Sequence, residues 1–290
     1  MEMQPKDLKT AFGLKFNPFI SELPLSALHC PSQVKSLLWD MENLVIDGGF
    51  AMISGETGLG KSSLLRIIEN HLSDIPDVYV AEMKRPQSSL RDFYPELGAM
   101  FQVDIKAFSR WHSFNSLRER WVSHIKNSLF RPVIIIDEAQ QMHPSVLTEL
   151  RILSSEKLDS RKILTIILAG DQRLNENMAS PELLPFYGRV RVRHKLQPLS
   201  KEDLTGMLTH VIKHAGNGKL MTSNLIALLA EHSCGNPRCM MIASDALLSA
   251  AAQSNRTQLD ESLYFEVFQG RLKKPLPKKG KQDHEYTDNL

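Results

Sequence analysis

The most regular pattern in the chain is a series of short apolar runs, separated by longer segments whose apolar residues have helical spacing. The runs lie at residues 50–53, 78–81, 133–136 and 163–168. They lack polar alternation, which is typical of strands that are buried on both faces. A fifth run at 191–196 alternates polar and apolar residues, so we expect an edge strand or a strand with one solvated face. The pattern predicts an α/β fold with a parallel sheet flanked by helices.

Helical patterns lie on both sides of this α/β region. The stretch 34–45 has its apolar residues on one helical face, and Gly48 and Gly49 end it. The acidic residues that follow Ser200 are typical of a capped helix start. The later helical segments, which no strand-like run interrupts, lie at 204–214, 223–232, 237–252 and 260–268.

We therefore expect the chain to have four parts. They are an N-terminal arm and helix (1–49), an α/β core (50–198), a small all-helical lid domain (199–270) and a flexible basic tail (271–290). The tail is rich in lysine, contains proline and is poor in apolar residues, a composition that cannot bury a core.

Composition narrows the class of protein. The formal charge of +2 over 290 residues is close to neutral, so any basic surface for a nucleic-acid partner must be local. The N-terminus lacks the apolar run of a signal peptide, and no run is long enough to span a bilayer. The three cysteines form no disulfide framework, so we expect buried free thiols in a reducing compartment. The composition indicates a cytoplasmic protein without a membrane segment.

A glycine-rich loop follows the first apolar run. It reads Gly55-Glu56-Thr57-Gly58-Leu59-Gly60-Lys61-Ser62, with Ser63 next, and it matches the Walker A pattern between a strand and a helix. Its glycines let backbone N–H groups curl around the β- and γ-phosphates. Lys61 carries a positive charge to the phosphate oxygens, and the hydroxyl of Ser62 is suited to ligate Mg²⁺. We therefore expect ATP and Mg²⁺ as cofactors.

A pair of acidic residues supplies the second half of the predicted site. Asp137 and Glu138 directly follow the apolar run 133–136. A buried strand that ends in an acid brings Asp137 beside the metal, and Glu138 is then positioned to polarise the attacking water as a general base. Together with the glycine loop, this pair predicts a Mg²⁺-dependent ATPase.

Further candidates extend this site. Asp171 ends the run 163–168 and its short turn, so it is a candidate to sense the γ-phosphate or orient the water, with a plain strand-end turn as the alternative. Arg238 opens a helix of the lid and is a candidate to touch the nucleotide across the cleft. One arginine of a basic cluster is a candidate arginine finger that reaches a neighbouring subunit, among Arg189, Arg191 and Arg193.

The order of these motifs resembles that of AAA+ ATPases. More narrowly, Phe12-Gly13-Leu14, Asn17-Pro18-Phe19, Ile136-Asp137-Glu138-Ala139-Gln140, Leu168-Ala169-Gly170 and Gly235-Asn236-Pro237-Arg238 are similar to the ATPase domain of general secretion pathway protein A. The resemblance implies that Arg189 is the arginine finger, Asp171 is sensor 1 and Arg238 is sensor 2. Position 171 departs from the family pattern, because relatives commonly carry Gln or Asn there and an acid repels the γ-phosphate.

The same branch contains the TnsC-like and phage Mu B-like helper ATPases of DNA transposons. The secretion relatives continue into a membrane segment and a cell-wall-binding domain that this sequence does not contain, which favours the transposition branch. The resemblance implies ATP-dependent rings or helical filaments on double-stranded DNA that recruit or activate a transposase, with a possible target-selector protein and slow, partner-regulated hydrolysis. In relatives the DNA contact comes from the loop after the second core strand, which implies contacts from Lys84, Arg85 and Arg91 that bind the backbone without reading sequence, with a plain solvated loop as the alternative.

Other functions share part of this pattern. A secretion or envelope-assembly ATPase that acts on protein partners is the main alternative. A helicase is disfavoured, because the chain has no second RecA-like half. A clamp loader or replication initiator shares the fold, although an initiator needs an additional DNA-reading domain. The basic tail is a candidate contact for DNA or transposase, with a merely solubilising terminus as the alternative.

Overall fold

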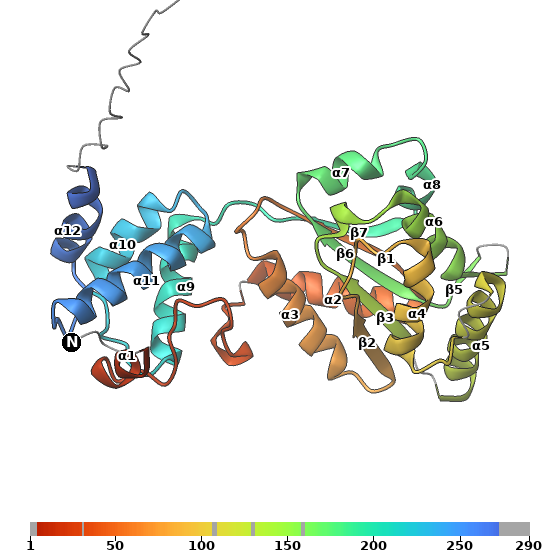
Figure 1. Cartoon of the computed structure of the whole chain (residues 1–290), viewed down its shortest axis with the longest axis horizontal. Coiled ribbons are helices and arrows are strands. Elements are labelled where there is room, and N and C mark those ends of the chain that lie inside the picture. Colours follow the sequence, from red (N-terminus) through yellow and green to blue (C-terminus); the bar gives the residue numbers. More distant parts are fainter. Residues whose placement is uncertain (1–4, 31, 106–108, 129–130, 158–159, 273–290) are drawn as a thin grey trace, which may run out of the picture.

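The computed structural model describes residues 5–30, 32–105, 109–128, 131–157 and 160–272, and Figure 1 shows that they form an α/β lobe and a helical lobe. The α/β lobe contains a parallel five-stranded sheet with the strand order β2-β3-β6-β1-β7. Its strands are β1 (Gly49–Ser54), β2 (Val78–Glu82), β3 (Arg131–Ile136), β6 (Thr165–Gly170) and β7 (Val190–Lys195). The predicted α/β class and parallel sheet are therefore confirmed.

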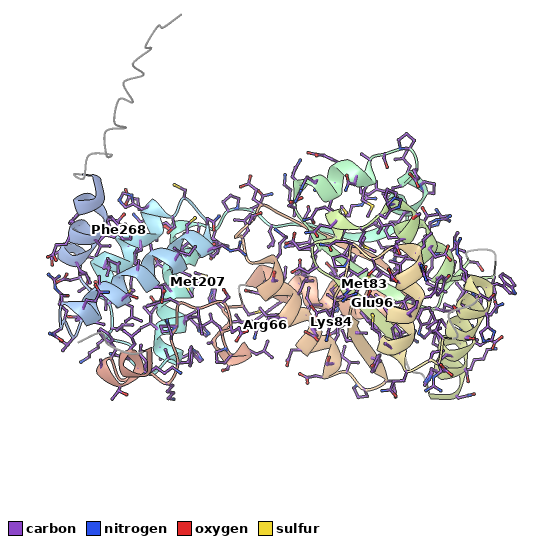
Figure 2. The ribbon with its side chains drawn as sticks, viewed as in Figure 1. Arg66, Met83, Lys84, Glu96, Met207 and Phe268 are labelled. Atoms are coloured by element: carbon purple, nitrogen blue, oxygen red, sulfur yellow. The ribbon has the colours of Figure 1, made fainter. Side chains whose placement is uncertain are left out.

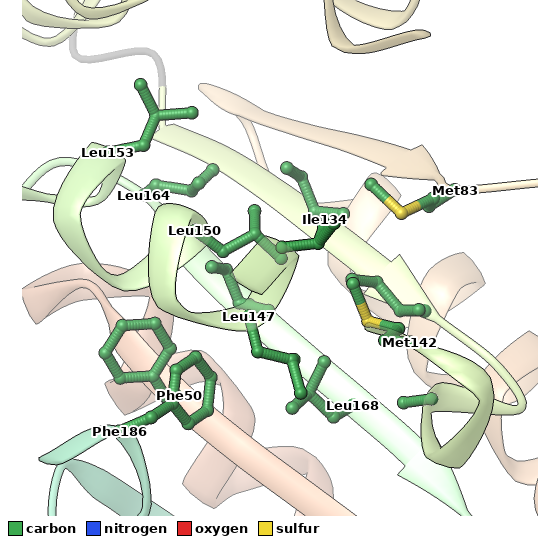
Figure 3. Close-up of a cluster of buried hydrophobic side chains, with 14 of the residues drawn as sticks. Phe50, Met83, Ile134, Met142, Leu147, Leu150, Leu153, Leu164, Leu168 and Phe186 are labelled. Carbon is green, nitrogen blue, oxygen red and sulfur yellow. The ribbon is translucent and has the colours of Figure 1, made fainter. Parts of the chain in front are cut away.

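The central strands are buried on both faces, as the unbroken apolar runs predicted. In β1, Phe50 and Met52 point into one core and Ala51 and Ile53 into the other. The strands β3 and β6 alternate in the same way, because successive side chains of a strand point to opposite faces. Figure 3 shows the first of these cores, in which Phe50 packs against Phe186 with ring centroids 4.6 Å apart.

Helices cover both faces of the sheet. One face packs against α2 (Ser32–Asp47) and α3 (Lys61–Ser73). The opposite face is covered by α4 (Leu90–Phe101), α5 (Arg110–Ser128), α6 (Pro144–Leu153), α7 (Gln172–Met178) and α8 (Leu184–Tyr187). A 3₁₀ turn, η2 (Ala139–Gln141), joins β3 to α6.

Three features of the strands test the details of the prediction. The alternating run lies in β7, at the edge of the sheet beside β1, as expected. The apolar run at 163–168 begins too early, because Ile163 and Leu164 are buried but precede β6. A small hairpin of β4 (Ser155–Glu156) and β5 (Arg161–Lys162) was not predicted, since strands of two residues carry no periodicity.

The helical lobe contains α9 (Lys201–His214), α10 (Ser223–His232), α11 (Pro237–Gln253) and α12 (Glu261–Leu272). Ser200 caps α9, because its side chain accepts a 3.0 Å hydrogen bond from the backbone N–H of Asp203. The N-terminal arm, with α1 (Pro5–Ala11) and the 3₁₀ turn η1 (Leu25–Ala27), also lies here: Phe12, Leu14 and Phe19 are buried in the core of this lobe. The arm and α2 therefore pack against different cores, although both fall within the first predicted part of the chain.

Three remaining expectations concern the cysteines, the tail and the membrane. The cysteines are exposed rather than buried, so that prediction was wrong; Cys234 and Cys239 flank a loop at the surface of the helical lobe. Helix α12 continues through Leu272, and the rest of the expected basic tail, 273–290, lies outside the described residues. Among the described residues, no helix combines the length and the apolar character that crossing a bilayer requires.

Candidate nucleotide site

The predicted site residues meet at one edge of the sheet. The strands β3, β6 and β1 are adjacent and parallel, so their carboxyl ends lie side by side. Asp137 follows β3, Asp171 follows β6, and the glycine loop follows β1. The topology therefore positions Asp171 between the acidic pair and the loop, which sequence spacing alone did not decide.

The glycine loop has the backbone of a phosphate cradle. Gly58 and Gly60 have φ angles of 90° and 92°, a region that side chains with a Cβ rarely adopt. A Cβ at Gly55 would lie only 2.8 Å from Cβ of Leu196, so this glycine also permits close packing of the residue that follows β7. The helix α3 begins at Lys61, directly after the loop, and its N-terminal N–H groups are suited to bind phosphate.

Lys61 is held inside the loop. Its side chain is buried, with 7% of the residue exposed, and its Nζ donates to the backbone carbonyls of Gly55 at 2.8 Å and Glu56 at 3.0 Å. An ammonium group has three N–H donors, so one remains for a phosphate oxygen. The loop therefore already orients Lys61, which is predicted to bind the phosphates of the nucleotide.

Two oxygen ligands suited to Mg²⁺ meet at the mouth of the loop. The Oγ of Ser62 donates to Oδ2 of Asp137 at 2.7 Å, although the two residues are 75 positions apart. Mg²⁺ prefers oxygen ligands and in nucleotide sites takes one or two from the protein, with water and phosphate supplying the others. The pair fits a nucleotide-borne Mg²⁺, and among the described residues no cluster of His, Cys, Asp and Glu forms a separate metal site.

Glu138 is positioned by Gln140, a motif residue for which the sequence indicated no role. Glu138 has a left-handed backbone with φ of 52°, and its exposed carboxylate accepts a 2.6 Å hydrogen bond from Nε2 of Gln140. The Oε1 of Gln140 accepts a 3.3 Å hydrogen bond from the backbone N–H of Asp171. Gln140 is buried, with 8% exposed, and so joins the ends of β3 and β6 beside the glycine loop.

Asp171 is paired with Arg173, which the sequence did not single out. The guanidinium donates to the carboxylate through Nε at 2.9 Å and through Nη2 at 2.6 Å. These hydrogen bonds hold the pKa of Asp171 below its usual range. Asp171 also caps α7 by accepting from the backbone N–H of Arg173. The acid is thus ionised and has a fixed cation partner.

The helical lobe contacts the glycine loop directly. Nδ2 of Asn236 donates to the carbonyl of Thr57 at 3.1 Å, and the backbone N–H of Arg238 donates to the carbonyl of Gly58 at 3.3 Å. A Cβ at Gly58 would lie 2.5 Å from Oδ1 of Asn236. The structure therefore brings Arg238 to the site, with its side chain exposed at the start of α11.

Two of the three clustered arginines lie in β7, and the third directly precedes it. Arg189 precedes the strand, at the amino end where Val190 pairs with Phe50, whereas the glycine loop follows the carboxyl end of β1. That separation is roughly 15–20 Å at the rise of an extended strand. Arg189 therefore does not reach the nucleotide site of its own subunit. Arg191 pairs with Asp47 at 3.0 Å, and Arg193 donates to the carbonyl of Tyr187 at 2.8 Å.

A basic loop joins β2 to α4. Lys84 and Arg85 are exposed, and Arg91 is exposed on the first turn of α4. Within the described part of the chain, no carboxylate forms an ion pair with any of these three side chains. The predicted DNA-contacting cations are therefore available at the surface.

The backbone of the basic loop is held by a carboxylate of α4. Glu96 accepts a 3.0 Å hydrogen bond from the backbone N–H of Arg85 and another from Oγ of Ser88. Figure 2 labels Lys84 and Glu96, which lie close together beside Met83. The loop therefore presents its cations from a fixed turn.

Comparisons with known proteins agree with this architecture. Residues 46–178 match a family model described as an AAA domain. General secretion pathway protein A of Aeromonas hydrophila is 28% identical over 244 residues, which make up 83% of this chain but 44% of that protein. This relative confirms the resemblance that the motifs indicated, and the chain spans less than half of its length.

Solved structures share the fold at low sequence identity. The ORC2 protein of Aeropyrum pernix, solved as ADPNP–ADP complexes, superposes with a TM-score of 0.68 and 14% identity, covering 90% of this chain and 72% of that one. The ORC1 protein of Aeropyrum pernix, solved in complex with DNA, gives a TM-score of 0.64 at 13% identity, covering 88% and 68%. Residues 46–178 therefore match an AAA domain, and the chain has the P-loop AAA+ fold.

Proposed function

We propose that this protein is an ATP-dependent, oligomeric AAA+ ATPase that binds duplex DNA. In the proposed site, the glycine loop and Lys61 hold the phosphates, and Ser62 and Asp137 hold Mg²⁺. Glu138 accepts a proton from the attacking water, and Gln140 keeps its carboxylate oriented. Arg238 of the lid contacts the bound nucleotide across the cleft.

The observation that carries the DNA proposal is a connection between the basic loop and the acidic pair. Nε2 of Gln87, in the basic loop, donates to Oε1 of Gln141 at 2.6 Å. Gln141 ends the short turn that begins directly after Glu138. A change in the ATP site can therefore be passed to Lys84 and Arg85 through one hydrogen bond, which supports DNA binding that depends on the nucleotide.

The position of Arg189 supports an oligomer. Because it precedes β7 at the amino end of the strands, whereas its own glycine loop follows the carboxyl end of β1, we propose that it contributes to hydrolysis at the site of a second copy. We therefore propose a homo-oligomer, either a ring or a helical filament, in which ATP is held between subunits. The four-part division of the chain, with a nucleotide-binding core at 50–198 and a lid at 199–270, belongs to this proposal.

The biological setting is proposed from the resemblance of the motifs. We propose a cytoplasmic regulator of DNA transposition that recruits or activates a transposase, with slow hydrolysis until a partner binds. The alternative is an ATPase of secretion or envelope assembly that acts on protein partners, and the relative from Aeromonas hydrophila supports it. Binding of DNA separates the two.

The experiment measures fluorescence anisotropy of labelled duplex DNA with a non-hydrolysable ATP analogue, with ADP and without nucleotide. We expect tight binding only with the ATP analogue, and a steep dependence on salt. The variant Lys84→Ala/Arg85→Ala should weaken binding to all sequences alike and reduce the salt slope by about 2 per subunit. The control Lys213→Ala/Lys219→Ala removes the same charge from exposed positions of the helical lobe and should bind as the wild type does.

Two outcomes count against the proposal. If the wild-type protein with the ATP analogue fails to bind duplex DNA at low salt, the function in transposition is wrong and the protein-partner alternative is favoured. If both double variants lose affinity equally, the basic loop is not the contact surface.

A further inference from the structure

The acid at position 171 raises a chemical problem that Arg173 resolves. A carboxylate beside the γ-phosphate of ATP repels it, so Asp171 is a poor group to contact that phosphate directly. In the structure the carboxylate of Asp171 is fully engaged by Arg173, which donates from its backbone N–H, Nε and Nη2. The two residues therefore act as one unit with a cation at its outer end.

The pair lies at the edge of the sheet that carries the proposed ATP site. Asp171 follows β6, between the strand that ends in Asp137 and the strand that leads into the glycine loop. Its backbone N–H reaches Gln140, which holds Glu138. The hydrogen bonds between the two side chains lower the pKa of Asp171 and raise that of Arg173, and the charges of Lys61 and Glu138 add to these shifts in the same directions.

Arg173 has donors left after it pairs with Asp171. A guanidinium carries five N–H groups in a planar fork. Among the described residues, Asp171 accepts every hydrogen bond that the Arg173 side chain donates, and these use Nε and Nη2 only. The side chain is 66% exposed, whereas that of Asp171 is 20% exposed. The Nη1 edge is thus available to an anion at the site.

We propose that Arg173 donates to the γ-phosphate of ATP bound in the same subunit, and that Asp171 positions it. In this arrangement Arg173 reads the presence of the γ-phosphate, and Asp171 contributes orientation and partial neutralisation rather than a contact. The inference rests on the ATP-binding part of the proposed function and is independent of DNA. It differs from a purely local role, in which Asp171 only caps α7 and the Arg173 side chain only pairs with Asp171.

The experiment compares the affinities for a non-hydrolysable ATP analogue and for ADP, by displacement of a fluorescent ADP. The variant Arg173→Ala should bind ADP within twofold of the wild type and the ATP analogue about tenfold more weakly, because a charge-assisted contact to the third phosphate is lost. Its kcat should fall by roughly 10²-fold. The variant Arg173→Lys should recover part of the ATP preference, since it keeps the charge but not the fork.

A matched control removes a surface arginine that pairs with a carboxylate elsewhere. Arg161 pairs with Glu156 at 3.2 Å in the β4–β5 hairpin, so Arg161→Ala tests the loss of such a pair. Its ATP and ADP affinities should equal those of the wild type. Thermal unfolding without nucleotide reports how much each variant changes the fold itself.

The possible results separate the inference from the function on which it rests. If the wild type prefers the ATP analogue and Arg173→Ala keeps the same preference, the Arg173 side chain only pairs with Asp171 and the inference is wrong. If Arg173→Ala weakens ADP and the ATP analogue equally, the inference is also wrong, because the effect is structural. If the wild type binds neither nucleotide, the ATP site itself is wrong, and with it the inference.

Discussion

Gln87 and Gln141 are joined by a 2.6 Å hydrogen bond between their side chains, which links the basic loop after β2 to the turn after Glu138. The two residues are 54 positions apart in the chain. They meet because β2 and β3 are neighbours in the sheet, so the segments that follow these strands leave the same edge. One polar contact thus connects the proposed DNA surface with the proposed general base.

The first prediction concerns this contact. Gln87→Leu and Gln141→Leu should each reduce the factor by which ATP tightens DNA binding, by about fivefold, the equivalent of one hydrogen bond. Because coupling between two ligands is reciprocal, the effect of DNA on ATP affinity should fall by the same factor. Binding titrations of each ligand, with and without the other, measure both.

The double variant tests whether Gln87 and Gln141 act through one shared hydrogen bond. Gln87→Leu/Gln141→Leu should lose no more coupling than either single variant, since both break the same bond. The surface change Gln253→Leu in α11 serves as the control. Additive losses would show that the two residues act separately.

A second prediction concerns the metal ligands. Ser62→Ala removes one oxygen ligand, and Asp137→Asn replaces a charged ligand with a weaker, neutral one. In each variant the Mg²⁺ concentration for half-maximal ATPase activity should rise about tenfold. Binding of ADP in the presence of EDTA should remain near that of the wild type for Ser62→Ala. An unchanged Mg²⁺ dependence in both variants would remove these residues from the metal site.

Gln140 is expected to act through Glu138. Gln140→Ala should lower kcat by roughly tenfold to a hundredfold, less than the full 10²–10⁴ of a general base, and should leave KM for ATP little changed. Combined with Glu138→Gln, it should cause almost no further loss, because both variants disable the same group. A steady-state comparison of the four proteins checks this, and independent losses from the two substitutions would contradict it.

A fourth prediction tests the arginine that lies far from its own site. Glu138→Gln and Arg189→Ala should each be inactive alone. Mixed in equal amounts, they should recover up to about a quarter of the wild-type rate, the fraction of subunit interfaces that pair the two intact residues. A mixture that stays inactive, although the subunits exchange, would mean that Arg189 does not act between subunits. Arg191→Ala is the comparison for the neighbouring position.

The last prediction concerns pH. Tyr94 and Glu149 are both buried, and the hydroxyl of Tyr94 donates to the carboxylate of Glu149, which Arg110 also contacts. Burial, followed by the hydrogen bond and charge of Glu149, raises the pKa of Tyr94 above its usual value of 10.0. The unfolded chain therefore loses this proton first, so stability should be constant with respect to Tyr94 below pH 10 and should fall as the pH rises above it.

Tyr94→Phe isolates this effect. It should cost about 1 kcal/mol at neutral pH through the lost hydrogen bond, and it should flatten the decline above pH 10. Urea unfolding at several pH values measures both. If the free energy of unfolding of Tyr94→Phe falls as steeply above pH 10 as that of the wild type, groups other than Tyr94 cause the decline.

Much of the fold was predictable from local patterns. The runs in β1 and β3 are apolar at successive positions because helices cover both faces of the sheet. This pattern can be seen directly in the sequence. The glycine loop was equally readable, since positive φ at Gly58 and Gly60 demands glycine. The hairpin at 155–162 was not readable, because two-residue strands depend on the turn and on packing rather than on periodicity.

The sequence by itself determined the class of fold, the phosphate loop, and the acids at the ends of the strands, because each of these depends on backbone conformation or burial at consecutive positions. Only the tertiary structure decided which distant side chains meet. It brings Gln140 to Asp171 and joins Gln87 to Gln141. Such contacts depend on which strands are neighbours in the sheet. The local sequence pattern of a strand does not specify its neighbours, so it does not predict these contacts.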